Sequence, residues 1–139
     1  MKKLRSTFMI EVIAYNEPGY QKLLSYKSWK VAMLNYTDEL CIENIAYFEA
    51  HDETDEVFVL LEGNMILYYL IDDHIHLLTL EKNKIYNVKK GIYHTHVLSQ
   101  DAKVLIVEED NTSYDNSKRI YIDDDLRHQL DMLWEKTRV

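Results

Sequence analysis

Short apolar runs with a period of two fill the chain from Ile42 to Asp110, and this pattern constrains the fold more than any other feature of the sequence. Val, Ile, Tyr and Phe are concentrated in these runs, and turn-forming and charged residues interrupt them. Such alternation is typical of β-strands. We expect eight strands, near residues 29–36, 42–50, 56–62, 65–71, 75–80, 85–88, 93–99 and 103–109. Eight short strands at this spacing predict an all-β sandwich or barrel.

Two candidate hairpin turns separate the central strands, one at Gly63–Asn64 and one at Asp72–Asp73. The central strands are therefore expected to form a meander. Nearer the N-terminus, Phe8 to Tyr15 has a strand-like pattern, whereas residues 20–30 fit either a helix or an extended segment. The polar stretch 111–119 is expected to be a connection.

The C-terminal segment has a helical period instead. Three aspartates at 123–125 stand where a helix N-terminus favours negative charge. They precede apolar residues that are spaced as one face of a helix, namely Leu126, Leu130, Leu133 and Trp134. This spacing predicts an amphipathic helix at about 124–137, packed on the barrel or on a second subunit.

Length and charge limit the size of the fold and the choice of partners. A chain of 139 residues fits one domain, spanning 1–139 with a barrel core at about 29–110, and it can bury a core without a disulfide or a metal. The formal net charge of −8 opposes binding to nucleic acid or to an anionic membrane surface. Cys41 is the lone cysteine, and the first residues lack an apolar run of the length that a signal peptide needs. We therefore expect a cytoplasmic protein.

A first group of possible metal ligands lies at 49–56. Glu49 and His51 are two residues apart, so on a strand both side chains project from the same face. Glu56 opens the next strand after a four-residue polar turn. The three side chains are therefore expected to converge.

A second group follows at 91–96. Gly91 marks a turn into a strand on which His94 and His96 share a face. Together the two groups offer two carboxylates and two or three imidazoles that would meet at one end of a barrel. Two His and one carboxylate suit a divalent first-row metal such as Zn, Fe(II), Mn or Ni, and they leave coordination positions open for a substrate.

The first group resembles the first motif of the cupin superfamily. That motif has His-x-His, then three or four residues, Glu, six residues and Gly. The chain has Glu49-x-His51, four residues, Glu56, six residues and Gly63. Glu49 therefore stands where the motif has its first His.

The second group is similar to the second cupin motif, in which Pro-x-Gly-x-x-His is followed, after three intervening residues, by Asn. The chain has Lys89-x-Gly91-x-x-His94, with Lys89 in place of Pro and Leu98 in place of Asn. The resemblance covers about residues 42–110, and two separated motifs are more specific together than either alone.

The resemblance implies a small antiparallel jelly-roll barrel, or double-stranded β-helix, which is often dimeric and commonly binds a metal in its interior. Carried over by position, the ligands would be His51, Glu56 and His94, with Glu49 in place of an imidazole. A carboxylate there shifts the preference toward Mn or Fe(II). The alternative is a metal-free polar cluster, in which Glu49 and Glu56 would repel each other so that one holds a proton or pairs with a protonated His.

Other polar side chains have several candidate roles. His96 faces the same way as the second-motif histidine and is a spare ligand, a proton-transfer group, a substrate contact or a structural residue. Tyr47 is expected to point into the cavity and to bind a small polar molecule. His74 and His76 also have the His-x-His spacing, but no carboxylate follows at the motif distance, so an exposed hairpin is favoured.

These observations predict a barrel that binds a divalent metal and a small polar molecule. As an enzyme it would isomerise or epimerise a sugar-like or hydroxy-acid substrate, with Glu49 or His96 transferring a proton, and an Fe(II) oxygenase is the rival chemistry. As a non-enzyme it would bind or sense a metabolite, with or without the metal. Val57 to Leu61 is apolar on both faces, and its outer face needs cover from the N-terminal segment or from a second copy, which predicts a homodimer.

Overall fold

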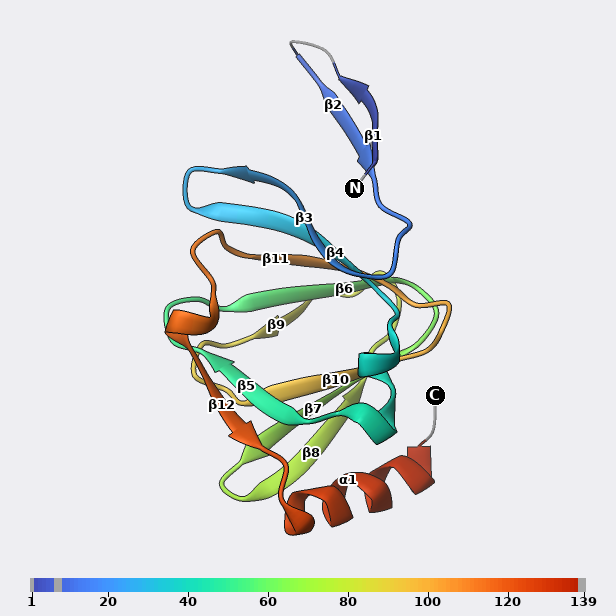
Figure 1. The fold of residues 1–139 in the computed structure, drawn as a ribbon, viewed down its shortest axis with the longest axis vertical. Coiled ribbons are helices and arrows are strands. Elements are labelled where there is room, and N and C mark those ends of the chain that lie inside the picture. The colour runs from blue at the N-terminus through green and yellow to red at the C-terminus, as the bar shows by residue number, and fades with distance from the viewer. Residues whose placement is uncertain (1, 7–8, 138–139) are drawn as a thin grey trace.

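Two five-stranded antiparallel sheets face one another and enclose the core (Figure 1). The computed structural model describes residues 2–6 and 9–137. The first sheet has the order β3 (Gly19–Tyr26), β4 (Trp29–Asn35), β11 (Lys103–Glu109), β6 (Glu56–Glu62) and β9 (Tyr86–Val88). The second has the order β12 (Ser117–Tyr121), β5 (Tyr47–His51), β10 (His94–Leu98), β7 (Met65–Ile71) and β8 (His74–Thr79). The predicted all-β barrel is confirmed.

The core lies between the sheets because side chains alternate along each strand. On β6, Phe58 and Leu60 are fully buried, whereas Val57 and Val59 lie half-buried on the outer face. Other residues buried between the sheets are Ala32, Leu34, Met65, Leu67, Val104 and Ile106. Burial of each large apolar side chain contributes about 1.5–3 kcal/mol to the free energy of unfolding, so this cluster holds the two sheets together.

Gly63 and Asn64 do not form the predicted hairpin. The chain crosses there from β6 in the first sheet to β7 in the second, so the predicted meander is wrong as well. Gly63 has a φ of 73°, and a Cβ at this position would lie 2.6 Å from the Cα of Ala102. Glycine is therefore required at this corner both by its backbone conformation and by the close approach of another loop. The second predicted hairpin, at Asp72–Asp73, is confirmed, because β7 pairs with β8.

Seven of the eight predicted strands lie within one residue of their predicted bounds. The exception is 42–50, where two short 3₁₀ helices (Asp38–Leu40 and Ile42–Asn44) precede a strand that starts at Tyr47. The open segment at 20–30 is extended, since β3 pairs with β4. The stretch 111–119 is more than a connection, because a 3₁₀ turn (Tyr114–Asn116) leads into β12, which pairs with β5.

The N-terminal segment forms a separate hairpin of β1 (Lys2–Ser6) and β2 (Glu11–Ala14) that extends away from the barrel (Figure 1). Part of the strand predicted from Phe8 to Tyr15 is thus present as β2, while Phe8 itself lies outside the described residues.

The predicted C-terminal helix is confirmed as α1 (Asp124–Thr137), which covers the outer face of the second sheet (Figure 1). Leu126 and Leu130 are buried there against residues of that face, including Phe48, Ile66 and Val97. The carboxylate of Asp123 accepts a hydrogen bond from the backbone N–H of Leu126 at 2.9 Å, which caps the N-terminus of the helix. Among the described residues, no helix combines the length and the apolar character needed to cross a membrane.

Candidate metal centre

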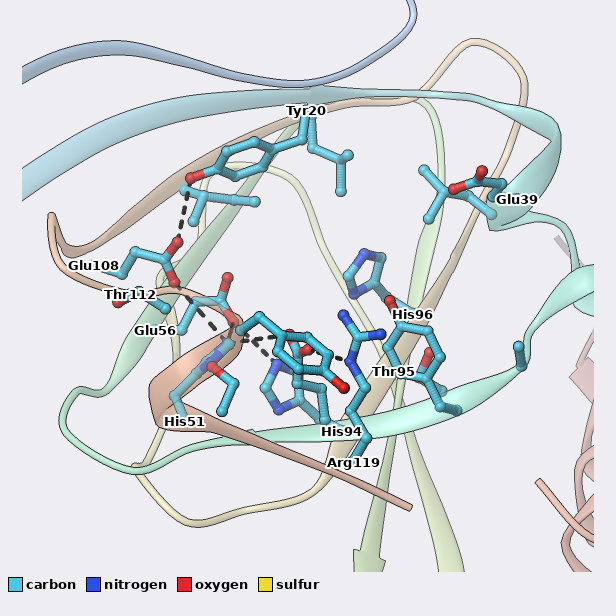
Figure 2. A pocket seen from close by; sticks show the side chains of 18 of the residues that line it. Tyr20, Glu39, His51, Glu56, His94, Thr95, His96, Glu108, Thr112 and Arg119 are labelled. Carbon is cyan, nitrogen blue, oxygen red and sulfur yellow. Dashed lines mark hydrogen bonds and ion pairs between the residues drawn. The ribbon is translucent and has the colours of Figure 1, made fainter. Parts of the chain in front are cut away.

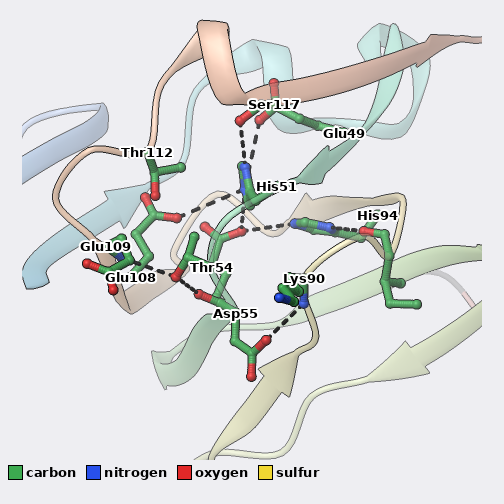
Figure 3. A network of polar contacts seen from close by, with 12 residues as sticks. Glu49, His51, Thr54, Asp55, Lys90, His94, Glu108, Glu109, Thr112 and Ser117 are labelled. Carbon is green, nitrogen blue, oxygen red and sulfur yellow. Dashed lines mark hydrogen bonds and ion pairs between the residues drawn. The ribbon is translucent and has the colours of Figure 1, made fainter. Parts of the chain in front are cut away.

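A cluster of buried titratable side chains lies between the two sheets (Figure 3). His51 and His94 come from the neighbouring strands β5 and β10 of the second sheet. Glu56 opens β6 in the first sheet and faces them. The cluster therefore bridges the two sheets, and the structure brings together three of the residues that the motifs indicate as ligands.

One oxygen of Glu56 lies at the centre of the cluster. Glu56 Oε1 is 3.0 Å from His51 Nε2 and 3.0 Å from His94 Nε2. The ligand atoms of the three residues all lie within 4.8 Å of one another, and all three side chains are buried. Two ligand atoms that are each about 2.1 Å from one ion lie about 3.0 to 3.4 Å apart, so this group could hold a metal ion with little rearrangement.

The other ring nitrogen of each histidine is held in place. His94 Nδ1 donates a hydrogen bond to the backbone carbonyl of Ile92 at 3.0 Å, and His51 Nδ1 lies 2.8 Å from the hydroxyl of Ser117. Metal-binding histidines usually have such a second partner, which fixes the ring and its tautomer.

The hydrogen-bonding pattern of His94 indicates whether a cation can lie between His94 and Glu56. Because a carbonyl only accepts hydrogen bonds, Nδ1 of His94 carries a hydrogen, and in the neutral ring the lone pair is then on Nε2. That lone pair faces the carboxylate of Glu56, which is also an acceptor. Two acceptors at 3.0 Å require a positive charge between them, supplied either by protons or by a metal ion. The donor set of two imidazoles and one carboxylate suits a divalent metal.

The protonation preferences of the metal-free cluster agree with this requirement. Burial acts to raise the pKa of Glu56, but hydrogen bonds from His51 and His94 outweigh burial and hold that pKa well below its ordinary value. Burial acts to lower the pKa of His51, but the hydrogen bond to Glu56 and the charges of nearby carboxylates raise it above its ordinary value. Without a metal, the cluster therefore holds protons on imidazole beside an ionised carboxylate.

Glu49, which the first motif aligns with a histidine ligand, lies beside this group. Its Oε1 is 4.0 Å from His51 Nε2, and its Oε2 accepts a hydrogen bond from Arg119 Nε at 2.9 Å. The guanidinium of Arg119 lies 4.0 Å from the ring centroid of Tyr47 and 4.9 Å from that of Tyr114. Arg119 thus contacts both Tyr47 and Glu49, and all three residues line the cavity.

Glu108, on β11, lies on the other side of the group and was not among the predicted site residues. Its Oε2 is 4.0 Å from His51 Nε2, and its Oε1 accepts a hydrogen bond from the hydroxyl of Tyr20 at 3.2 Å. Lys30 Nζ lies 3.6 Å from the same Oε1. Burial, together with the charge of Glu56, raises the pKa of Glu108 to about 7.

His96 lies farther along β10 and lines the same cavity (Figure 2). Its ring lies 5.6 Å from that of Phe58, and its Nδ1 is buried without a hydrogen-bond partner. Burial lowers the pKa of His96 to about 4, so this ring is neutral at pH 7. His74 and His76 are exposed on the β7–β8 hairpin, as predicted.

The cavity has a volume of about 830 Å³. The residues that line it include carboxylates, imidazoles, Lys30 and Arg119, together with the apolar side chains of Leu34, Leu40 and Ile106. Ligand cavities of this size hold small molecules, and the mixture of a few polar groups with apolar walls is typical of them.

Several residues that line the cavity were not predicted from the sequence. A signal was present for Lys30 and Glu108, because each is a charged residue at an inward position of an alternating strand, two residues from buried Ala32 and Ile106 respectively. Ser117 and Arg119 gave no such signal, since β12 has a polar sequence.

Comparisons with solved structures identify the type of fold. No protein-family model matches the sequence, and no curated protein sequence does so. A cupin-2 domain-containing protein from Shewanella frigidimarina is 20% identical, over 68% of this chain and 84% of its own, with a TM-score of 0.50. Pac13, described as a nucleoside dehydratase, is 7% identical over 78% of this chain and 83% of its own, with a TM-score of 0.56. A Streptomyces PAC13 variant with uridine is 10% identical over 88% and 93%, with a TM-score of 0.57. The chain thus has the cupin fold that its two motifs predicted.

Proposed function

We propose that the barrel binds a divalent metal through His51, Glu56 and His94 and a small polar molecule in the adjoining cavity. The observation that supports this proposal is the position of Glu56 Oε1, 3.0 Å from the Nε2 atoms of two histidines whose other ring nitrogens are already hydrogen-bonded. When bound, the metal would act as a Lewis acid that polarises a carbonyl or hydroxyl oxygen.

The reaction that suits these residues best is isomerisation or epimerisation of a sugar-like or hydroxy-acid substrate. Glu49 borders the cavity and has one oxygen fixed by Arg119, which leaves the other oriented toward the centre to transfer a proton. His96 is neutral and is the second candidate proton acceptor. In such a reaction the base takes a proton from the carbon beside the carbonyl and returns it to the substrate, so the reaction needs no oxidant or reductant. Tyr47 and Arg119 would bind hydroxyl or carboxylate groups of the substrate.

An Fe(II) oxygenase with O₂ as co-substrate is the second candidate, because two histidines and one carboxylate are also the ligand set of non-haem iron enzymes. A barrel that only binds or senses a metabolite is the non-catalytic alternative, and we expect a measurement of metal content to separate it from both enzymes.

The test is elemental analysis of protein purified without added metal or chelator. We expect about one divalent ion per chain, and we expect His51→Ala to lose it. His76→Ala is the matched control, because His76 is exposed on the β7–β8 hairpin and should leave the metal content unchanged. If the wild-type protein carries no metal and its melting temperature does not rise with Mn, Fe(II), Ni or Zn, the metal centre is refuted and the metal-free binding module takes its place.

We also propose that the protein is a homodimer formed through the outer face of the first sheet. Strand register aligns apolar side chains there in two rows across three strands: Val31, Val107 and Val57, and Met33, Leu105 and Val59. Leu24 and Leu61 extend this face and are each 39% exposed. The N-terminal hairpin, one of the two predicted covers, extends away from the barrel instead. A second copy would supply the cover through the same apolar face, as in a two-fold interface.

A further inference from the structure

Two carboxylates lie at equal distances from His51, one of the proposed metal ligands. Glu49 Oε1 and Glu108 Oε2 each lie 4.0 Å from His51 Nε2 (Figure 3). Glu49 comes from the second sheet and Glu108 from the first. Either could be drawn to a cation held by His51, and their surroundings distinguish them.

Glu49 already has a partner of opposite charge. Its Oε2 accepts a hydrogen bond from Arg119 at 2.9 Å, and Arg119 is in turn packed on the ring of Tyr47. The side chain of Glu49 is 26% exposed, so water can solvate its remaining oxygen. The charge of Glu49 is therefore stabilised by Arg119 and by water without a metal.

Glu108 also has a cationic partner, Lys30, but the oxygen that faces the centre is shielded from water. The residue is 7% exposed, and its Oε2 is buried without any hydrogen bond. Its Oε1 is anchored by the hydroxyl of Tyr20 and by the ion pair with Lys30. A buried carboxylate oxygen without a partner is costly, and most such atoms in folded proteins have one. The anchoring of Oε1 aims Oε2 at the centre.

We propose that Glu108 is the fourth protein ligand of the metal, alongside His51, Glu56 and His94. This inference rests on the proposed metal centre. Two carboxylates neutralise a divalent cation, and two imidazoles with two carboxylates form a harder donor set than the three-histidine pattern, which favours Mn(II) or Fe(II) over Zn(II). Tyr20 and Lys30 are then positioning residues, and Glu49 stays available for the substrate.

The experiment compares Glu108→Gln with Glu49→Gln, two isosteric changes that each remove one charge. Mn(II) affinity is measured by titration calorimetry, and the coordination of Co(II) is followed by its visible absorption spectrum. For Glu108→Gln we expect an Mn(II) affinity at least about 100-fold weaker and an altered Co(II) spectrum. Replacing a residue that only orients a metal ligand typically weakens metal affinity by roughly 10- to 100-fold, so the expected loss lies at or beyond that range. For Glu49→Gln we expect the spectrum of the wild type and an affinity within a few-fold of it. Circular dichroism and the melting temperature of the metal-free proteins check that both variants fold.

The opposite pattern would overturn the inference. If Glu49→Gln weakens Mn(II) binding and alters the spectrum while Glu108→Gln does neither, Glu49 is the fourth ligand. If neither variant changes the spectrum, Glu108 is a buried acid that keeps its proton beside Glu56, and the three-residue centre stands alone. A wild-type protein that binds neither Mn(II) nor Co(II), or one that binds them equally well after His51→Ala, would refute the centre itself.

Discussion

Glu56 and His94 lie on different sheets of the barrel, yet Glu56 Oε1 is 3.0 Å from His94 Nε2. A metal held by both residues would therefore tie the two sheets together. Binding would then be measurable as stability, because an ion that binds only the folded state raises the free energy of unfolding.

We expect a divalent metal at a concentration about 100 times its Kd to raise the free energy of unfolding by about 2.7 kcal/mol. Thermal melts with and without chelator measure this shift. His94→Ala should abolish the shift, whereas His76→Ala should keep it because His76 is exposed on the β7–β8 hairpin and does not belong to the cluster. A shift that survives His94→Ala would place the binding site elsewhere.

The pH dependence of stability should change sign with metal. In the metal-free protein, the raised pKa values of Glu108 and His51 mean that the folded state binds more protons than the unfolded state between about pH 4.5, the ordinary pKa of a glutamate, and pH 7 or above. The lowered pKa of His96 opposes this trend below about pH 6.5, because the folded state binds fewer protons than the unfolded state at that ring. Stability should therefore fall as pH rises from about 6.5 to about 8. The lowered pKa of Glu56 adds stability that is present above pH 4.5 and is lost in more acidic solution.

With Mn(II) present we expect stability to rise over the same interval, since protons and metal compete for the same atoms. Urea denaturation at several pH values, with chelator and with Mn(II), measures both slopes. Glu108→Gln should flatten the metal-free slope, because it removes one of the two groups responsible. Parallel slopes with and without Mn(II) would argue against metal binding at this cluster.

The outer face of the first sheet should control the oligomeric state. Val59→Lys places a charge in the middle of the apolar rows, and we expect the mass measured by light scattering to fall from that of a dimer to that of a monomer. Met132→Lys is the matched control, because Met132 is an exposed apolar residue on α1, which covers the other sheet. A wild-type protein that is monomeric across micromolar concentrations would contradict the dimer.

The corner at Gly63 should be more sensitive to substitution than the turn at Gly91. Gly63→Ala adds a Cβ that would lie 2.6 Å from the Cα of Ala102 and also forces a residue with a side chain to a φ of 73°. We expect a loss of about 2–4 kcal/mol in the free energy of unfolding.

Gly91→Ala separates the two causes of that loss. Gly91 has a φ of 83°, but among the described residues no atom beyond its chain neighbours lies within 4 Å of the place that a Cβ would take. Its substitution should therefore cost only the backbone strain, about 1–2 kcal/mol. Equal losses for the two variants in urea denaturation would show that the contact with Ala102 has no effect.

The sequence predicted the strands and the two motif histidines because alternation and short spacing are local properties of the chain. The partner of each strand is not a local property, which is why Gly63 looked like a hairpin turn although it joins two sheets. The same limit applies to the site. His51 and Glu56 belong to one motif, but Glu108 approaches them only because β11 pairs with β6. Arg119 likewise reaches Glu49 only through the pairing of β12 with β5.

The pairing of β12 with β5 has a consequence for how such barrels are recognised. Ser117 orients His51, and Arg119 fixes Glu49, yet both residues follow the last motif position by more than about fifteen residues. A chain shortened after β11 would keep every motif residue and lose the groups that orient two of them. In a homologue, matching motifs therefore indicate the fold. Whether its site can hold the corresponding side chains in place must be judged from the strand that corresponds to β12.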